Sequence, residues 1–342
     1  MKRLLCSLLC AAMLLTGCTA PAQQKTRYNA TFLTLFDTVT TIVGFAASED
    51  EFRAAAQSIH YELLIYHQLF DVYNDYDGIN NLKTINDNAG VAPVAVDRKI
   101  IDLLLDCKNY YDLTGGKVNV AMGGVLYLWH EARNDGIDDP LGAYLPDTAA
   151  LESAAAHTSM DSVVIDESAG TVFITDPLVR LDVGAIAKGW AVERVARSAP
   201  EGLLLSVGGN VRATGNKDEN GSPWVVGIQN PDDADSYLHS IYVYADCSSV
   251  VTSGDYQRTY AVDGTLYHHI IDPETLYPST FWRSVTIVCA DSGAADALST
   301  ALFLMEYAQG LALLERFDAH AMWVAPDGTI LYSPGFEELI RT

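Results

Sequence analysis

Apolar residues recur every three or four positions in several parts of the chain, which is the spacing of one face of an α-helix. The clearest case is residues 51–70, where Phe52, Ile59 and Leu63 fall on the same face and predict an amphipathic helix. A second helix is expected to stop at two consecutive glycines, 115 and 116. The helices predicted besides the first cover residues 99–114, 147–156 and 291–305, a segment ending near Arg197, and one segment between 310 and 340.

Short runs that are rich in β-branched residues, or that alternate between apolar and polar ones, predict β-strands. In chain order these runs cover residues 36–45, 162–165, 171–174, 202–213, 224–229, 239–245, 249–252 and 283–289. Residues 162–165 and 171–174 are expected to form a hairpin, and residues 202–213 one buried strand containing a glycine pair. Strands and helices intermix without a repeating βαβ order, so the pattern predicts an α+β fold rather than a doubly wound parallel sheet.

Three stretches lack a clear period. Residues 72–90 are dense in Asn and Asp and are predicted to be loops around a short turn, and residues 134–146 are predicted to be a polar surface loop. Residues 117–129 mix extended residues with Gly123 and Gly124 at an expected backbone bend, where the two glycines could let a ligand approach the main chain or simply permit a tight turn. No internal repeat and no low-complexity linker divides the sequence into further domains.

The N-terminus carries the pattern of a bacterial lipoprotein signal. Lys2 and Arg3 precede an apolar run over residues 4–15, and the sequence Leu-Thr-Gly-Cys ending at Cys18 has the form of a lipobox. The run is too short to span a bilayer, and no later segment resembles a membrane-spanning helix. We therefore expect the protein on the outer face of the cytoplasmic membrane, held there by its lipid alone. The expected division is a signal peptide over residues 1–17, a lipidated tether over 18–30, and a folded domain over 31–342.

Charge and cysteine content narrow the choice of partners. The 342 residues carry a formal net charge of −23, which argues against nucleic acid and anionic lipid headgroups as partners. An anionic small molecule would need a local cation or a metal ion in its site. Cys6 and Cys10 lie in the predicted signal peptide. Cys107, Cys247 and Cys289 are widely spaced in apolar surroundings and read as small buried side chains, with no disulfide implied.

One stretch is a candidate anion site. Residues 179–182 read as a short extended run that ends in the carboxylate of Asp182; a glycine at 184 follows, and a helix then opens with Lys188 near its start. A helix N-terminus presents free backbone N–H groups and the positive end of the helix dipole, and a lysine there adds charge for a phosphate. The same residues also suit an ordinary connection between a strand and a helix, which this stretch alone favours.

Asp296 and Thr300 form a second candidate site. They lie four residues apart on a predicted helix, so their oxygen atoms share one face, with Ser299 beside them. One carboxylate together with hydroxyl and carbonyl oxygens suits Mg²⁺, which keeps several waters and binds substrate phosphates. The alternative is that Asp296 serves only the helix N-terminus and Thr300 is an internal helix residue; these residues alone favour it.

His269 is a third candidate. It lies between an apolar strand and the turn signal Asp272-Pro273, where a histidine can act as general base for a hydroxyl. A hydrogen-bonded structural histidine fits the local sequence equally well. The chain has no GxSxG, HExxH, Walker or GxGxxG pattern, so the motifs of common hydrolases, zinc proteases and nucleotide-binding proteins suggest no alternative function.

These candidates fall within a series of short motifs that occur in one order along the chain. The motifs are Phe-Asp-Thr-Val-Thr from residue 36, Asp-Val-Gly-Ala-Ile-Ala-Lys-Gly-Trp-Ala-Val from 182, Ser-Val-Gly-Gly-Asn-Val-Arg-Ala-Thr-Gly from 206, Thr-Ser-Gly-Asp-Tyr from 252, His-His-Ile-Ile-Asp-Pro from 268 and Ala-Asp-Ala-Leu-Ser-Thr-Ala from 295. With the lipobox, this series resembles the ApbE family, the FAD:protein FMN transferases. The resemblance extends from about Phe32 to the C-terminus.

The resemblance implies a single T-fold-related domain with mixed, mostly antiparallel sheets flanked by helices. It also implies a Mg²⁺-dependent enzyme that splits FAD, attaches FMN through a phosphodiester to a Thr or Ser of an acceptor protein, and releases AMP. The metal ligands it implies are the backbone carbonyl of Ala185 and the side chains of Asp296 and Thr300, with Ser299 adjacent. His269 matches the histidine proposed to activate the acceptor hydroxyl. The implied FAD contacts are Phe36, Tyr73, Lys117, Val118, Asn119, Asp182, Lys188 and Ile271.

The same resemblance implies acceptors among the flavoproteins of extracytoplasmic redox complexes; that nucleic acid is not a partner follows from the net charge. The chain departs from the family pattern at two places: Asn119-Val120-Ala121 replaces Asp-Pro-Thr or Asp-Ile-Thr, and Leu276 stands where many members have glycine. Two other functions stay open. One is a Mg²⁺-dependent FAD pyrophosphatase that uses water in the same site, and the other is a lipid-anchored flavin-binding protein without chemistry.

Overall fold

The computed structural model describes residues 25–342. The predicted signal peptide, the lipidation site Cys18 and the tether up to residue 24 lie outside the described residues. The first strand, β1 (Thr26–Leu35), includes residues 26–30, which were expected to belong to the tether. Tyr28, Ala30 and Phe32 alternate along β1 and pack against the main hydrophobic core, so the fold begins before the predicted boundary at residue 31.

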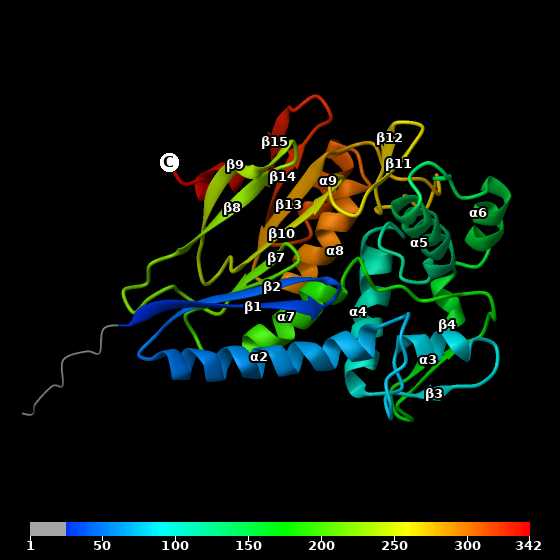
Figure 1. Ribbon diagram of the computed structural model, residues 1–342, viewed down its shortest axis with the longest axis horizontal. Coiled ribbons are helices and arrows are strands. Elements are labelled where there is room, and N and C mark those ends of the chain that lie inside the picture. Colours follow the sequence, from blue (N-terminus) through cyan, green and yellow to red (C-terminus); the bar gives the residue numbers. More distant parts are fainter. Residues whose placement is uncertain (1–24) are drawn as a thin grey trace, which may run out of the picture.

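An eight-stranded sheet forms the centre of the fold (Figure 1). Its strand order is β1-β2-β6-β7-β10-β13-β14-β15, and all neighbouring strands are antiparallel. The strands that follow β1 are β2 (Thr38–Ala46), β6 (Leu203–Val207), β7 (Asn210–Ala213), β10 (Ser249–Gly254), β13 (Ser284–Cys289), β14 (Ala319–Val324) and β15 (Ile330–Tyr332). Antiparallel pairing with helices packed on the sheet confirms the predicted α+β class.

The middle of the sheet is covered on both faces. All six residues of β13 are buried, although successive side chains of a strand point to opposite faces. Ile287 packs on one side with residues of helix α8 (Ser292–Phe303). Val288 packs on the other side with the hairpin β8 (Trp224–Asn230) and β9 (Asp233–Val243). The fold therefore has three layers at this point, with the sheet between a helical layer and a second pair of strands.

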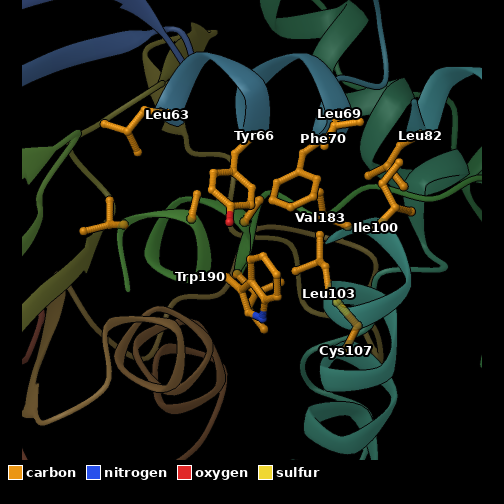
Figure 2. Packing of buried hydrophobic residues seen from close by; sticks show 14 of the residues in the cluster. Leu63, Tyr66, Leu69, Phe70, Leu82, Ile100, Leu103, Cys107, Val183 and Trp190 are labelled. Carbon is orange, nitrogen blue, oxygen red and sulfur yellow. The ribbon is translucent and has the colours of Figure 1, made fainter. Parts of the chain in front are cut away.

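A second group of helices packs beside β1 and β2 (Figure 1). These helices are α2 (Glu49–Phe70), α4 (Arg98–Leu113) and α7 (Ala187–Ser198). Figure 2 shows Tyr66 and Phe70 of α2 directed at Trp190 of α7. The ring centroids lie 5.8 and 5.7 Å from that of Trp190 in edge-to-face geometry, and Trp190 Nε1 donates a 2.7 Å hydrogen bond to Asp106 of α4. The aromatic cluster thus fixes α7 against the two N-terminal helices.

Two stretches predicted to be irregular contain helices. Helix α3 (Leu82–Asp87) lies within residues 72–90, and α5 (Gly123–Asp138) replaces the expected backbone bend and the first part of the expected surface loop. Gly123 donates its N–H to the carbonyl of Arg180, and a Cβ at this position would lie 2.7 Å from that oxygen. The glycine is therefore required by the close approach of two chain segments, and it does not bend the backbone.

Tight turns change two predicted strands: residues 36–45 lose their first two residues to a turn, and residues 202–213 are reversed. Phe36 and Asp37 form the turn between β1 and β2, with φ of 53° and 52°. Residues 202–213 form the hairpin β6–β7 instead of one strand, because Gly208 and Gly209 adopt φ of 54° and 91° and reverse the chain. Glycine adopts such angles without steric cost, whereas the same angles at Phe36 and Asp37 are strained.

The remaining elements flank this body. The predicted hairpin of residues 162–174 is confirmed, and it forms a small sheet with β3. These elements are β3 (Val94–Ala95), β4 (Val163–Asp166), β5 (Thr171–Ile174), β11 (Tyr260–Val262), β12 (Thr265–Tyr267), α6 (Thr148–Ala155), α9 (Tyr307–Leu314) and the short 3₁₀ helices Met160–Ser162 and Phe336–Leu339. Within residues 25–342, Cys107, Cys247 and Cys289 are free thiols. None of the helices in this part of the chain has the length and hydropathy needed to cross a membrane.

Candidate active site

A cavity of about 480 Å³ opens at one end of the central sheet. Its wall is built from the β1–β2 and β6–β7 turns, the end of β10, and residues of α5, α7 and α8. Cavities of this volume are typical of small-molecule sites. The predicted site residues that line it are Tyr73, Lys117, Asn119, Asp182, Ala185, Lys188, His269, Ile271, Asp296 and Thr300.

Three predicted site residues lie off the wall. Phe36 lies beside it in the β1–β2 turn, whose next two residues do line the cavity. Val118 is fully buried in the apolar cluster around α8. Ser299 is fully buried as well, and its Oγ lies 2.8 Å from Ser253 Oγ and 2.9 Å from the carbonyl oxygen of Asp296. Ser299 therefore supports the wall from behind through Ser253, which faces the cavity.

The predicted strand-to-helix junction, residues 179–188, lines the cavity and is hydrogen-bonded to the segment that precedes α5. Asp182 donates its N–H to the carbonyl of Val120 at 2.8 Å, and its Oδ1 accepts from the N–H of Gly184 at 2.8 Å. Lys188 Nζ donates to the carbonyl of Gly184 at 3.1 Å and lies 3.8 Å from Asp296 Oδ2. The junction therefore places Lys188 at the cavity beside Asp296, the carboxylate of the second candidate site.

Asp296 caps a helix, but not its own. Helix α8 is capped by Asp291, whose side chain accepts from the N–H of Ala294. Helix α7 has no side-chain cap from its own N-cap residue, and instead Asp296 Oδ2 accepts from the N–H of Gly189 at 2.8 Å. A carboxylate at this position is also stabilised by the positive end of the α7 dipole. The carboxylate is thus held from the neighbouring helix, and Oδ1 remains for a ligand.

This arrangement depends on a backbone contact between α7 and α8. A Cβ at Gly189 would lie 2.2 Å from the carbonyl oxygen of Ser292 and 2.5 Å from Asp296 Cβ. Contacts this short do not occur between real atoms, so any larger residue at Gly189 would push the two helices apart. The absence of a side chain at Gly189 therefore places Asp296 at the cavity.

Three residues of the cavity lining offer oxygen atoms of the kinds that suit a hard divalent cation. Ala185, Asp296 and Thr300 all line the cavity, and together they supply a carbonyl, a carboxylate and a hydroxyl oxygen. Within residues 25–342, no cluster of three or more His, Cys, Asp or Glu side chains is placed to hold a metal ion. A single carboxylate with neutral oxygens is the kind of site in which Mg²⁺ keeps waters and binds substrate phosphates.

The cavity wall also carries cations, in a protein with a net charge of −23. Lys117 pairs with Asp272 at 3.1 Å and with Glu274 at 2.8 Å. Arg133 contacts His130 and Asn134. Arg258 donates to the carbonyl of Phe36 at 3.4 Å. Neither arginine forms an ion pair within the described part of the chain. Burial and the neighbouring Arg258 lower the pKa of Arg133. Sequence reasoning missed both arginines; only the position of Arg258, two residues past the Thr-Ser-Gly-Asp-Tyr motif, hinted at a role.

The two adjacent histidines differ in their hydrogen bonds. His268 uses both ring nitrogens on the backbone: Nε2 donates to the carbonyl of Ser279 at 2.8 Å, and Nδ1 accepts from the N–H of Ile270 at 3.2 Å. The Nδ1 atom of His269 is buried and has no partner among the described residues. Burial, together with the charges of Arg258 and Lys188, lowers the pKa of His269 to about 3. His269 is therefore a neutral imidazole that lines a positively charged cavity and has a buried, unpartnered Nδ1.

Aromatic side chains form much of the rest of the wall. Tyr73 stacks on His130 with ring centroids 4.8 Å apart and planes 23° from parallel. Trp129, Tyr260 and Tyr267 also line the cavity. His130 and Trp129 come from α5, which was predicted to be extended or looped, so sequence reasoning missed them as well. These flat surfaces suit the ring systems of a large planar ligand.

The sequence model of the ApbE family matches residues 30–323, which is most of the chain. The chain belongs to the ApbE family. Two relatives carry the name FAD:protein FMN transferase. One, from Treponema pallidum, is 35% identical over 278 residues, covering 76% of this chain and 75% of the relative. The other, from Klebsiella pneumoniae, is 32% identical over 277 residues, covering 78% and 83%.

Solved structures of ApbE proteins share the fold. The crystal structure of the ApbE protein from Thermotoga maritima superposes with a TM-score of 0.81 and 29% identity, covering 93% of this chain and 100% of that one. A flavin transferase ApbE from Vibrio cholerae superposes with a TM-score of 0.75 and 24% identity, covering 92% and 99%. The antiparallel sheet and its flanking helices are thus the ApbE architecture.

Replacing Gly189 with alanine tests the helix contact on which this ApbE site depends. Because the new Cβ meets the Ser292 carbonyl, we expect Gly189→Ala to lower the free energy of unfolding by about 1–3 kcal/mol. We also expect it to displace Asp296 and to reduce AMP release from FAD. Urea unfolding and an AMP assay measure the two effects. Gly124→Ala in α5, where the nearest atom is 3.7 Å from the added Cβ, is the matched control. Parent-like stability and AMP release in Gly189→Ala would show that the contact does not hold the site.

Proposed function

We propose that this protein transfers FMN from FAD to a Thr or Ser hydroxyl of acceptor proteins and releases AMP. The observation that carries the proposal is that one cavity joins aromatic rings, cations, a set of oxygen ligands and a neutral histidine. FAD offers two ring systems with a pyrophosphate between them, so each part of the cavity has a matching part of the ligand. The names of the relatives from T. pallidum and K. pneumoniae support the same reaction.

The proposed cofactor is Mg²⁺, held by the Ala185 carbonyl and the side chains of Asp296 and Thr300. Asp296 Oδ2 accepts from Gly189 N–H, whereas Oδ1 accepts no hydrogen bond within residues 25–342 and fits a ligand to an ion that also binds phosphate oxygens. When bound there, Mg²⁺ would supply positive charge to the pyrophosphate. Lys188, at 3.8 Å from Asp296 Oδ2, adds a second positive charge beside the same oxygens.

In the proposed reaction, His269 accepts the proton of the acceptor hydroxyl as general base. The hydroxyl oxygen attacks the phosphorus of the FMN half and forms the new phosphodiester bond. The bond from that phosphorus to the bridging oxygen breaks, and AMP leaves with its electron pair. The neutral state of His269 and its position in the cavity wall support this role, whereas His268 is held in one tautomer by the backbone.

Water in place of the acceptor hydroxyl would make the same site an FAD pyrophosphatase, and an inert site would make the protein a flavin carrier. Incubation with FAD and Mg²⁺, with and without coexpressed redox flavoproteins as acceptors, separates the three. Covalent FMN on an acceptor, found by mass spectrometry together with AMP, supports the transferase. Free FMN and AMP formed equally well without an acceptor would replace it with the pyrophosphatase, and unchanged FAD with the carrier.

The metal assignment is tested at Asp296. We expect Asp296→Asn to lower AMP release by about 10²–10³-fold at fixed Mg²⁺, because the amide removes the only carboxylate among the proposed ligands. The variant keeps an oxygen that can accept from Gly189 N–H, so the α7–α8 contact survives and thermal unfolding should stay close to that of the parent. Near-parent rates of AMP release at saturating Mg²⁺ would remove Asp296 from the metal site.

The base is tested at His269, with His268→Ala as the structural control. We expect His269→Ala to lower transfer by about 10²–10⁴-fold while FAD still binds. Since the pKa of His269 lies at about 3, its active neutral form persists as the pH falls from 8 to 5. The value of kcat/KM, which reports the free enzyme, should therefore lack an acid limb near the ordinary histidine pKa of about 6.5. A limb at that pH that disappears in His269→Ala would contradict the depressed pKa.

We also propose that a lipid on Cys18 anchors the protein to the outer face of the cytoplasmic membrane, where extracytoplasmic redox flavoproteins would be its acceptors. The support is the lipobox that ends at Cys18. We expect Cys18→Ser to move the protein from the membrane fraction to the soluble extracytoplasmic fraction, as measured by immunoblot after cell fractionation. Retention of the serine variant in salt-washed membranes would rule out anchoring through this cysteine.

A further inference from the structure

The β1–β2 turn is a strained element at the rim of the cavity. It consists of Phe36 and Asp37, with Leu35 paired to Thr38 across it. Both turn residues have left-handed backbone angles, with φ of 53° and 52°, where a two-residue hairpin turn normally has Asn or Gly. Strain of this kind persists only when neighbouring groups hold it, and it is common at functional sites. Asp37 and Thr38 line the cavity, so the turn sets the shape of this part of the wall.

His67, in the last turn of α2, holds this turn by its backbone. Its Nδ1 accepts the N–H of Phe36 at 3.2 Å, and its ring packs edge-on against the Phe36 ring with centroids 5.6 Å apart. Arg258 Nη2 donates to the carbonyl of the same residue at 3.4 Å. Arg258 itself has φ of 49°, so two strained segments meet across Phe36.

The proton positions around His67 follow from its partners. Asp71 Oδ2 accepts from the Tyr76 hydroxyl at 2.7 Å. Burial and this hydrogen bond raise the pKa of Tyr76 to about 12, so the hydroxyl keeps its proton. The Tyr76 oxygen is then an acceptor for His67 Nε2, 3.4 Å away. Since His67 must also accept from Phe36 with Nδ1, its ring is neutral with the proton on Nε2.

Asp71 connects this relay to a second part of the wall. Its Oδ1 accepts from the backbone N–H of Tyr73 at 2.7 Å and of Asn74 at 3.0 Å. Tyr73 lines the cavity and stacks on His130. One carboxylate at the end of α2 therefore fixes Tyr73 directly, and fixes the Phe36 turn through Tyr76 and His67.

We propose that His67 is a positioning residue for FAD: through the Asp71–Tyr76–His67 relay it holds the strained Phe36–Asp37 turn in the conformation that receives the ligand. The inference rests on the proposed function, since FAD is the ligand in both. His67 does not line the cavity and touches no reacting atom, so its loss acts on FAD affinity and leaves the chemical step intact.

The test compares four variants of the full chain in FAD binding and in steady-state AMP release. His67→Leu removes both ring nitrogens at similar volume, and His67→Asn keeps an acceptor near the Nδ1 position. Tyr76→Phe removes only the hydroxyl. His60→Leu is the matched control, because His60 is on the same helix and packs against Phe32 in the middle of β1, away from the turn.

We expect His67→Leu to raise both the FAD dissociation constant and KM about tenfold, the effect of losing one buried hydrogen bond, with kcat unchanged at saturating FAD. His67→Asn should recover most of the affinity, and His60→Leu should bind FAD like the parent. Tyr76→Phe should weaken binding less than His67→Leu, and combining it with His67→Leu should add nothing further, because Tyr76 acts through His67.

Parent-like FAD affinity in His67→Leu would overturn the inference, as would a fall in kcat with unchanged affinity, or equal losses in His67→Leu and His67→Asn. If His67→Leu does not fold, Tyr76→Phe and His67→Asn carry the comparison. Direct FAD binding separates this test from that of the proposed function: a parent that binds FAD without releasing AMP refutes the reaction and leaves the comparison of affinities decisive for His67.

Discussion

The site depends on the place where helices α7 and α8 touch through their backbones. Gly189 has no side chain, so its N–H reaches the carboxylate of Asp296. The aromatic cluster around Trp190 packs α7 in the position that this contact needs. The two motifs that supply the oxygen ligands are more than a hundred residues apart, and this contact makes them one site. A proposed ligand set with a single carboxylate needs such precision, because the other two proposed ligands, Ala185 and Thr300, are neutral.

Charge is distributed unevenly between the protein and its cavity. The chain carries −23, yet Lys188, Arg133 and Arg258 face the cavity, and within residues 25–342 the two arginines have no acidic partner. Cations left without partners are costly in isolation and favourable once an anion arrives. Burial is the main reason that His269 is neutral, and these cations lower its pKa further because a protonated imidazole would add another positive charge among them. The same field therefore attracts a pyrophosphate and helps to keep a base unprotonated.

Much of the fold and several residues of the site could be predicted from the sequence, and the predictions that were wrong have physical reasons. The periodicity of α2 and α4 and the β-branched runs predicted the long helices, the strands and the α+β class, because both patterns are local. The role of Gly123 stayed open, because a glycine in a tight turn and a glycine that permits close approach look alike in a sequence. Here the close approach is to Arg180, far along the chain. Phe36 was predicted to be in a strand, since nothing in its neighbours reveals that His67 stabilises a turn there. Ser299 was predicted to lie beside the metal because it is next to Thr300 in sequence, but its position on α8 directs its side chain into the core.

Strand β1 lies between the proposed site of lipid attachment and the cavity. It begins at Thr26, next to the segment that would carry the lipid, and ends at the turn that shapes the cavity. Ten residues of extended chain span about 30 Å. Figure 1 shows the start of β1 at the opposite side of the molecule from α5, whose residues line the cavity. With the anchor proposed at Cys18, the lipid would join the chain ahead of the end of β1 that lies away from the cavity. The covalent path from the lipid to the catalytic residues would therefore include the whole length of this strand.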